Sequence, residues 1–137
     1  MSTKQFIIED NVLVKYWGDG GDVVIPDGIT AIGEWAFYTC AAVTSVVIPD
    51  AVTTIGELAF YKCTGLETVG FGNGLIEIGP SAFYGCTSLT AVKIPASVTT
   101  IGEDAFLWCV NLTGVELGKA YAPSGRQHST SVRVWKR

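Results

Sequence analysis

The sequence of 137 residues has one histidine, His128, and little charge, since Asp, Glu, Lys and Arg together make up 16%. No apolar run approaches the roughly 20 residues of a membrane-spanning helix. The first residues, MSTKQFIIED, lack the long apolar stretch and the small-residue cleavage site of a secretory signal. These absences argue against a membrane span and against a metal centre built on several histidines.

Positive charge is scarce over residues 1–118, which hold four basic and thirteen acidic side chains and so carry a net charge of −9. Over 119–137 there are five basic side chains and no acidic one. An acidic body repels the phosphates of nucleic acids, so we predict no nucleic-acid partner. The hydrophobic content of 48% predicts one folded domain with a core.

A short sequence repeat dominates the chain. Residues 25–40 read IPDGITAIGEWAFYTC, residues 48–63 read IPDAVTTIGELAFYKC, and residues 94–109 read IPASVTTIGEDAFLWC. Several columns keep the spacing from Cys40 to Cys63 over four copies, which chance does not explain. The columns include Ile32, Ile55, Ile78 and Ile101; Gly33, Gly56, Gly79 and Gly102; Ala36, Ala59, Ala82 and Ala105; Phe37, Phe60, Phe83 and Phe106; and Cys40, Cys63, Cys86 and Cys109.

Each repeat begins with a pattern that predicts a short strand. In LTAVKIP at 89–95, Val92 and Ile94 alternate with outward residues, as in a strand with one buried face. Pro95 lacks an amide hydrogen and is expected to end the strand.

The second half of each repeat predicts a turn and a short helix. Gly102 is expected to permit a backbone turn that other residues avoid. The segment EDAFLWC at 103–109 then predicts about two helical turns, with Phe106 filling the middle of the coil.

A single coil made of one repeat buries too little to be stable, so the copies are expected to stack with like side chains above like. The fold class predicted is therefore a repeat solenoid of about four rungs. Residues 1–21 are expected to hold a capping β-hairpin (over 6–16) and a loop, residues 22–118 the solenoid, and residues 119–137 a basic tail that either adds an edge strand or is disordered. Three glycines in GFGNG at 70–74 predict a bulge or wider turn.

Residues 89–109, LTAVKIPASVTTIGEDAFLWC, resemble the BspA-like leucine-rich repeat family, also called the Treponema-type repeat. The resemblance covers about residues 22–118. It implies a curved leucine-rich-repeat solenoid with short parallel strands and short helical turns, found in bacterial surface or secreted proteins. It also implies adhesion to host matrix proteins or to other microbes. No family motif defines a binding residue here.

An aromatic stripe is the first candidate binding site. Side chains that flank the Ala-Phe pair of each rung should line up outside the coil, and such a patch can mark an interface. The competing interpretation is that the tyrosines serve partly in packing. The candidate residues are Trp35, Tyr38, Tyr61, Tyr84 and Trp108.

The outward side of the repeat strands is the second candidate. Solenoids commonly bind partners along this sheet face. Val47 and Lys93 represent it here, and its small, weakly charged side chains indicate no particular ligand.

The four cysteines share the repeat period and do not show the spacing of a zinc site. Stacked rungs bring them within disulfide range, but parallel side chains in a ladder favour buried free thiols. No acid, base or nucleophile recurs in register, so we predict neither an enzyme nor a cofactor.

Two functions fit these observations. The first is a non-catalytic protein-binding module on the cell surface or secreted, with a host matrix glycoprotein as a candidate ligand. The second is a cytoplasmic or structural module that forms homodimers through its open solenoid end or its tail.

Overall fold

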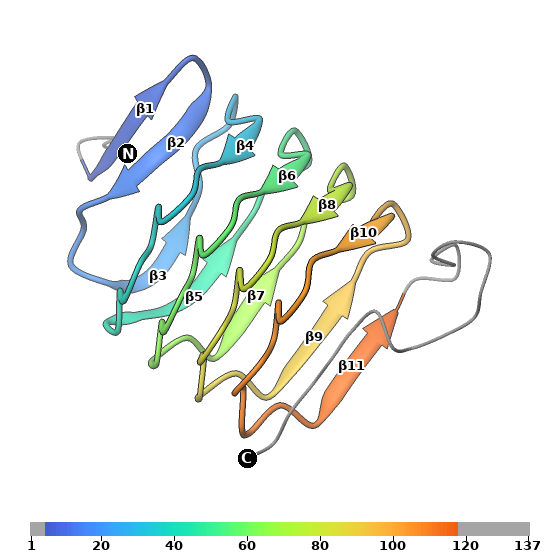
Figure 1. Cartoon of the computed structure of the whole chain (residues 1–137). Helices are drawn as coiled ribbons and strands as arrows, with labels where there is room; N and C mark the ends of the chain where they lie inside the picture. The colour runs from blue at the N-terminus through green and yellow to red at the C-terminus, as the bar shows by residue number, and fades with distance from the viewer. Residues whose placement is uncertain (1–4, 118–137) are drawn as a thin grey trace.

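The computed structural model describes residues 5–117, and the tail element predicted over 119–137 lies outside them. The described residues form eleven short strands that wind into a stack of similar coils (Figure 1). The strands are β1 (Phe6–Glu9), β2 (Val12–Tyr16), β3 (Gly21–Val24), β4 (Ala31–Ile32), β5 (Val43–Val47), β6 (Thr54–Ile55), β7 (Thr68–Gly70), β8 (Glu77–Ile78), β9 (Ala91–Ile94), β10 (Thr100–Ile101) and β11 (Gly114–Leu117).

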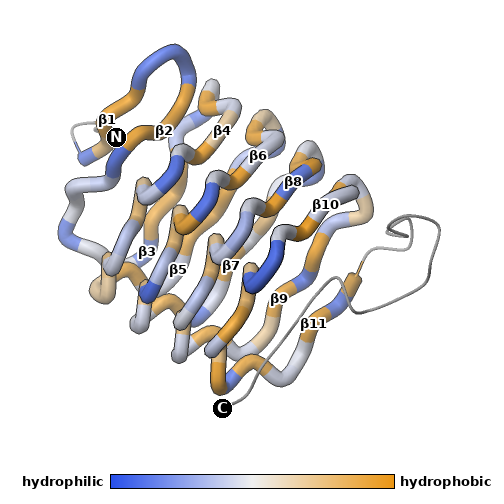
Figure 2. Tube along the Cα trace, in the orientation of Figure 1, coloured by the Kyte–Doolittle hydropathy of each residue, from blue (hydrophilic) through white to orange (hydrophobic). Residues whose placement is uncertain are grey.

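The coils stack in register, which confirms the solenoid prediction. One side carries a six-stranded sheet in the order β1-β2-β4-β6-β8-β10, and the other carries the sheets β3-β5-β7 and β11-β9. Partners across most parallel ladders lie one repeat apart in the sequence, as for Val46 with Val69 and Ile55 with Ile78. Hydrophobic stretches therefore recur at matching places in successive turns (Figure 2).

The core is a column of stacked phenylalanine rings. Phe37, Phe60, Phe83 and Phe106 are fully buried, as the sequence predicted for Phe106. Neighbouring ring centroids lie 4.6, 4.9 and 5.3 Å apart, with interplanar angles of 13° or less. The inward strand residues of the repeat surround this column, so each rung closes the core of the next.

The predicted hairpin over 6–16 is present and joins the solenoid. Strands β1 and β2 are antiparallel, and Asp10 and Asn11 turn between them with φ of 51° and 66°, as a two-residue hairpin turn requires. The ring of Tyr16 stacks on Phe37 at 4.9 Å, and its hydroxyl accepts a hydrogen bond from the Gly20 amide at 2.9 Å. Tyr16 therefore continues the aromatic column into the cap.

The helical turns predicted after each Ile-Gly pair are wrong. Residues 5–117 contain no helix, and so none that is long and apolar enough to cross a membrane. Asp104 and Trp108 have φ of 61° and 65°, which interrupts any helix over 103–109. The reason is the stack itself: in the preceding rungs, alternate amides of this segment bond to the next rung, as Phe60 N does to Ala82 O at 2.7 Å. The amides between them bond three residues back, as Ala59 N does to Gly56 O at 3.2 Å, and not to carbonyls four residues back.

The glycine after each repeat isoleucine has a different role from the one predicted. Gly102 has no left-handed φ, unlike Gly28 and Gly85. A Cβ on Gly102 would instead overlap the Pro80 nitrogen, and one on Gly56 would lie 2.9 Å from the Glu34 nitrogen. The column of glycines therefore lets successive backbones approach closely.

Of the bulge or wider turn predicted at 70–74, the bulge is absent from the pairing of β7 with β5, and the sheet breaks after β7 instead. Strand β7 pairs with β5 without a register shift, but β7 and β9 belong to different sheets. A Cβ on Gly72 would lie 2.6 Å from the Pro49 carbonyl carbon, so the third rung closes tightly onto the second. Phe71 replaces the smaller Ile48 of the preceding rung and packs edge-on against Phe83, with centroids 5.9 Å apart. The pairing is lost on the far side of that rung.

Candidate functional site

Four of the predicted aromatic residues come together on one side of the coil. The rings of Tyr38 and Tyr61 stack at 5.3 Å with an interplanar angle of 5°, and Tyr61 and Tyr84 stack at 5.1 Å. Trp35 meets Tyr38 edge-on at 4.7 Å and Tyr61 at 6.2 Å. We call Trp35, Tyr38, Tyr61 and Tyr84 the aromatic stripe.

The connections from even-numbered to odd-numbered strands hold the stripe in place. Trp35 has a φ of 63°, a conformation that disfavours a bulky side chain. Leu58, Ser81 and Asp104 share this conformation at the same place in later rungs, so it belongs to the repeat. The Tyr38 amide donates to the Trp35 carbonyl at 3.1 Å and closes the turn that carries both aromatic side chains.

The stripe is accessible at its N-terminal end. Trp35 is 44% exposed and Tyr38 is 38% exposed, whereas Tyr61 and Tyr84 are half-buried. The ammonium group of Lys62 lies 5.5 Å from the centre of the Tyr61 ring, within the range of a cation–π contact. The arrangement offers an apolar surface with polar tips, the type of surface that dominates protein interfaces.

Trp108 lies apart from these four residues. It occupies the column of Thr39, Lys62 and Gly85, one position after the tyrosine column, and it is 44% exposed. Leu107 stands in the tyrosine column of that rung. Within residues 5–117 no aromatic contact joins Trp108 to the stripe.

The break between β7 and β9 divides the predicted sheet face. Val47 on β5 is 49% exposed beside Val24 on β3, which is 65% exposed. Lys93 on β9 is exposed across the break, where it borders a shallow hollow of about 400 Å³ together with Glu116. The structure thus places the two candidate residues of this face in separate sheets.

Three of the four cysteines form a buried ladder, and all four have free thiols as predicted. The Sγ atoms of Cys63, Cys86 and Cys109 donate hydrogen bonds to phenylalanine carbonyls of the preceding rung at 3.0 to 3.2 Å. Burial raises the pKa of the Cys63 thiol to about 12, and it also raises the pKa of Cys86. These two neutral thiols act in packing, because the nucleophilic and metal-binding form is the thiolate.

We expect the raised thiol pKa to make stability depend on pH. Above pH 9 the unfolded chain ionises Cys63 while the folded chain keeps its proton, so the unfolded state binds fewer protons and stability falls. Between pH 8 and pH 10 the loss from Cys63 should be about 1.4 kcal/mol. Urea unfolding at both pH values checks this, with Cys63→Ala as the control. An equal fall in stability for both proteins would contradict it.

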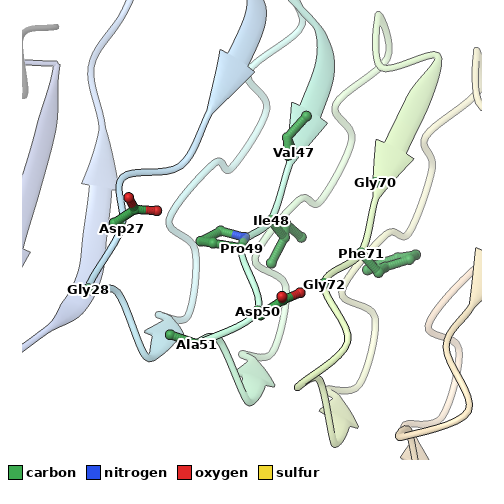
Figure 3. A pocket seen from close by; sticks show the side chains of 10 residues that line it. All are labelled: Asp27, Gly28, Val47, Ile48, Pro49, Asp50, Ala51, Gly70, Phe71 and Gly72. Atoms are coloured by element: carbon green, nitrogen blue, oxygen red, sulfur yellow. The ribbon is translucent and has the colours of Figure 1, made fainter.

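Sequence reasoning missed an open groove on the opposite side of the coil from the stripe. The groove has a volume of about 690 Å³ and lies at the ends of β3, β5 and β7, where the chain turns toward the even-numbered strands. Figure 3 shows Asp27, Val47, Asp50 and Phe71 among its lining residues, on three successive rungs. The signal in the sequence is that glycine stands at position 70, in the column where Val24 and Val47 point outward. By itself this indicates only a loosened rung.

Groups of at least three His, Cys, Asp or Glu side chains suited to a metal ion do not occur in the described part of the chain. The features that remain for a ligand are therefore the stripe, the divided sheet face and the groove.

The comparisons with known proteins identify the family. The family model described as BspA type leucine rich repeat region (6 copies) matches residues 16–124. The chain belongs to this family. The predicted resemblance is thus confirmed, and it extends over more of the chain than the sequence columns indicated.

Solved structures of other bacterial repeat proteins are similar to this BspA-type protein. A leucine-rich repeat protein from Bacteroides capillosus ATCC 29799 is 30% identical with a TM-score of 0.74, over 85% of this chain and 96% of the other. The T. pallidum leucine rich repeat protein is 29% identical with a TM-score of 0.66, over 84% and 70%. A leucine rich cell surface protein from Faecalibacterium prausnitzii A2-165 is 27% identical with a TM-score of 0.64, over 89% and 43%. No curated protein matches the chain.

Proposed function

We propose that this BspA-type repeat protein is a non-catalytic protein-binding module that acts on the bacterial cell surface or after secretion. The observation that carries the proposal is the aromatic stripe, an exposed and ordered apolar surface on a rigid solenoid. Large aromatic side chains with polar tips are the residues that contribute most at protein interfaces. The similar protein from Faecalibacterium prausnitzii, which is named a cell surface protein, supports the location.

The candidate ligand is a glycoprotein of the host extracellular matrix, and Trp35 is the proposed anchor. It is the most prominent member of the stripe because it is the largest side chain there and is 44% exposed. Its contacts to Tyr38 and Tyr61 hold the indole in one orientation, so little side-chain entropy is lost when a partner covers it.

Trp35→Ala should weaken binding to an immobilised matrix glycoprotein by at least about tenfold, the effect of losing one interface hot spot. The full chain is first tested against a panel of such glycoproteins by surface plasmon resonance, and the variant is then measured on any that binds. Trp17→Ala is the matched control, because Trp17 is 64% exposed but lies in the loop after the hairpin. Thermal melts verify that both variants fold.

Four outcomes decide the proposal. Loss of binding in Trp35→Ala alone supports the stripe as the site. An equal loss in Trp108→Ala would extend the site along the whole solenoid. The proposal would be overturned if the chain bound no glycoprotein in a saturable way. It would also be overturned if neither Trp35→Ala nor Trp108→Ala weakened the binding.

A further inference from the structure

The groove at the ends of β3, β5 and β7 exists because the third rung has glycine at positions 70 and 72 and so presents no outward side chain there. A Cβ on Gly70 would meet nothing within 4 Å, so the position after the exposed Val47 in this column is open space. The backbone of Gly72 closes onto Pro49, and Phe71 turns its ring inward against Phe83. The result is a hollow with an apolar wall, within the range of volumes that bind ligands.

The charged side chains that line the groove are both negative. Asp27 and Asp50 occupy the same column on neighbouring rungs, which are spaced by about 4.8 Å in a parallel sheet. One oxygen of Asp50 accepts a hydrogen bond from the Asn73 amide at 2.8 Å, while within residues 5–117 no donor is bonded to the Asp27 carboxylate. Among the described residues, no basic side chain lines the groove.

Both carboxylates are exposed and carry the same sign of charge, so each attracts a cation that enters the groove. The surroundings reinforce this preference, because residues 5–117 contain thirteen acidic residues and three lysines. A guanidinium or ammonium group on a long aliphatic stem also matches the apolar wall at Val47 and Pro49, since such stems pack on apolar surface while the head reaches a carboxylate.

We propose that the groove binds an arginine or lysine side chain of an extended peptide segment of a partner protein. The cationic head enters the groove beside the carboxylates of Asp27 and Asp50, and an apolar neighbour in the peptide covers Val47. This site is distinct from the aromatic stripe, because it is built from the connections that lead from odd-numbered to even-numbered strands and the stripe is built from those that lead back.

The test is an NMR titration of the full-length ¹⁵N-labelled chain with two peptides. One is acetyl-Gly-Val-Arg-Val-Gly-amide, and the other carries citrulline, which has nearly the shape of arginine without its charge. The arginine peptide should shift the amide signals of Asp27, Asp50 and Gly70 in a saturable way. Added salt should weaken the binding of this peptide. The citrulline peptide should bind at least about tenfold more weakly.

Two groove variants and two controls complete the test. Asp27→Asn with Asp50→Asn removes the charge, and Gly70→Val fills the groove without a clash, as the valines at 24 and 47 indicate. Each variant should lower the affinity for the arginine peptide at least about fivefold. Glu34→Gln with Glu57→Gln removes two acidic charges on the opposite side and should leave binding unchanged. Trp35→Ala should also leave it unchanged, so failure of the stripe and failure of the groove are separable.

Several results would overturn the proposal. Equal binding of both peptides would exclude recognition of the charge. Shifts that survive both groove variants, or that spread over the acidic surface without saturation, would reduce the interaction to non-specific attraction. If the arginine peptide bound only after residues 119–137 were removed, the occupant of the groove would be the basic tail of this chain and not a partner protein.

Discussion

Phe60→Ala is expected to lower the free energy of unfolding by roughly 3–5 kcal/mol. Phe60 is fully buried, and its ring stacks on Phe37 at 4.6 Å and on Phe83 at 4.9 Å. Removing it leaves a cavity between two filled rungs, and the backbones cannot collapse into it because hydrogen bonds hold their spacing. Urea unfolding followed by circular dichroism measures the loss.

The place of Phe60 in the stack gives this prediction a second readout. Stability in a solenoid is close to a sum of rung and neighbour terms, so a gap in the middle uncouples the two halves. We expect the unfolding transition of Phe60→Ala to broaden. Phe60→Leu keeps much of the ring volume and should lose less than half as much stability. A loss below about 1 kcal/mol for Phe60→Ala would show that the column contributes little.

Gly74→Ala is expected to destabilise the protein by about 1–3 kcal/mol, although it adds only one methyl group. A Cβ on Gly74 would overlap the Asp50 carbonyl oxygen, so the backbone of one of the two rungs must move. The movement would strain the closure of the third rung onto the second. Differential scanning calorimetry should show a lower melting temperature.

Gly70→Ala is the matched control for this change. Both glycines belong to the same irregular segment, but a Cβ on Gly70 meets nothing within 4 Å. It should therefore leave stability unchanged or raise it slightly, because alanine restricts the unfolded chain. Equal destabilisation by both substitutions would mean that the segment needs glycine for its flexibility and not for close approach.

The core could be predicted because every copy of the repeat places apolar residues at the same positions. Val92, Ile94 and Phe106 could be assigned to the interior from one rung, and the other rungs supplied independent copies of the same pattern. All three are buried. The hairpin over 6–16 was also predictable, because its turn residues, Asp10 and Asn11, tolerate positive φ.

The prediction of helical turns failed because periodicity cannot tell a helix from a turn that faces a neighbour. Residues 103–109 place apolar side chains at helical spacing, yet two of them have positive φ. In the three preceding rungs, alternate amides of this segment bond to carbonyls of the next rung, as Phe83 N does to Ala105 O at 2.8 Å. Such bonds exist only in the stack, so the secondary-structure propensities of the residues do not predict them.

The candidate sites were also predictable only in part. The sequence placed Tyr38, Tyr61 and Tyr84 in one column, and the period alone predicts that they line up. The position of Trp35 against two of these rings depends on the turn geometry of its rung. The groove depends on how Gly72 closes onto Pro49 and how Phe71 turns inward, and neither follows from the pattern.

The sequence by itself thus determined the period, the inward columns, the stacked architecture and the family of this protein. These properties follow from which side chains are apolar and how often they recur. Only the tertiary structure decided the conformation of the turns, the role of the glycine column, the break between β7 and β9, and the groove beside Asp27 and Asp50. Those properties arise from contacts and hydrogen bonds between rungs, whose geometry exists only once the rungs are stacked.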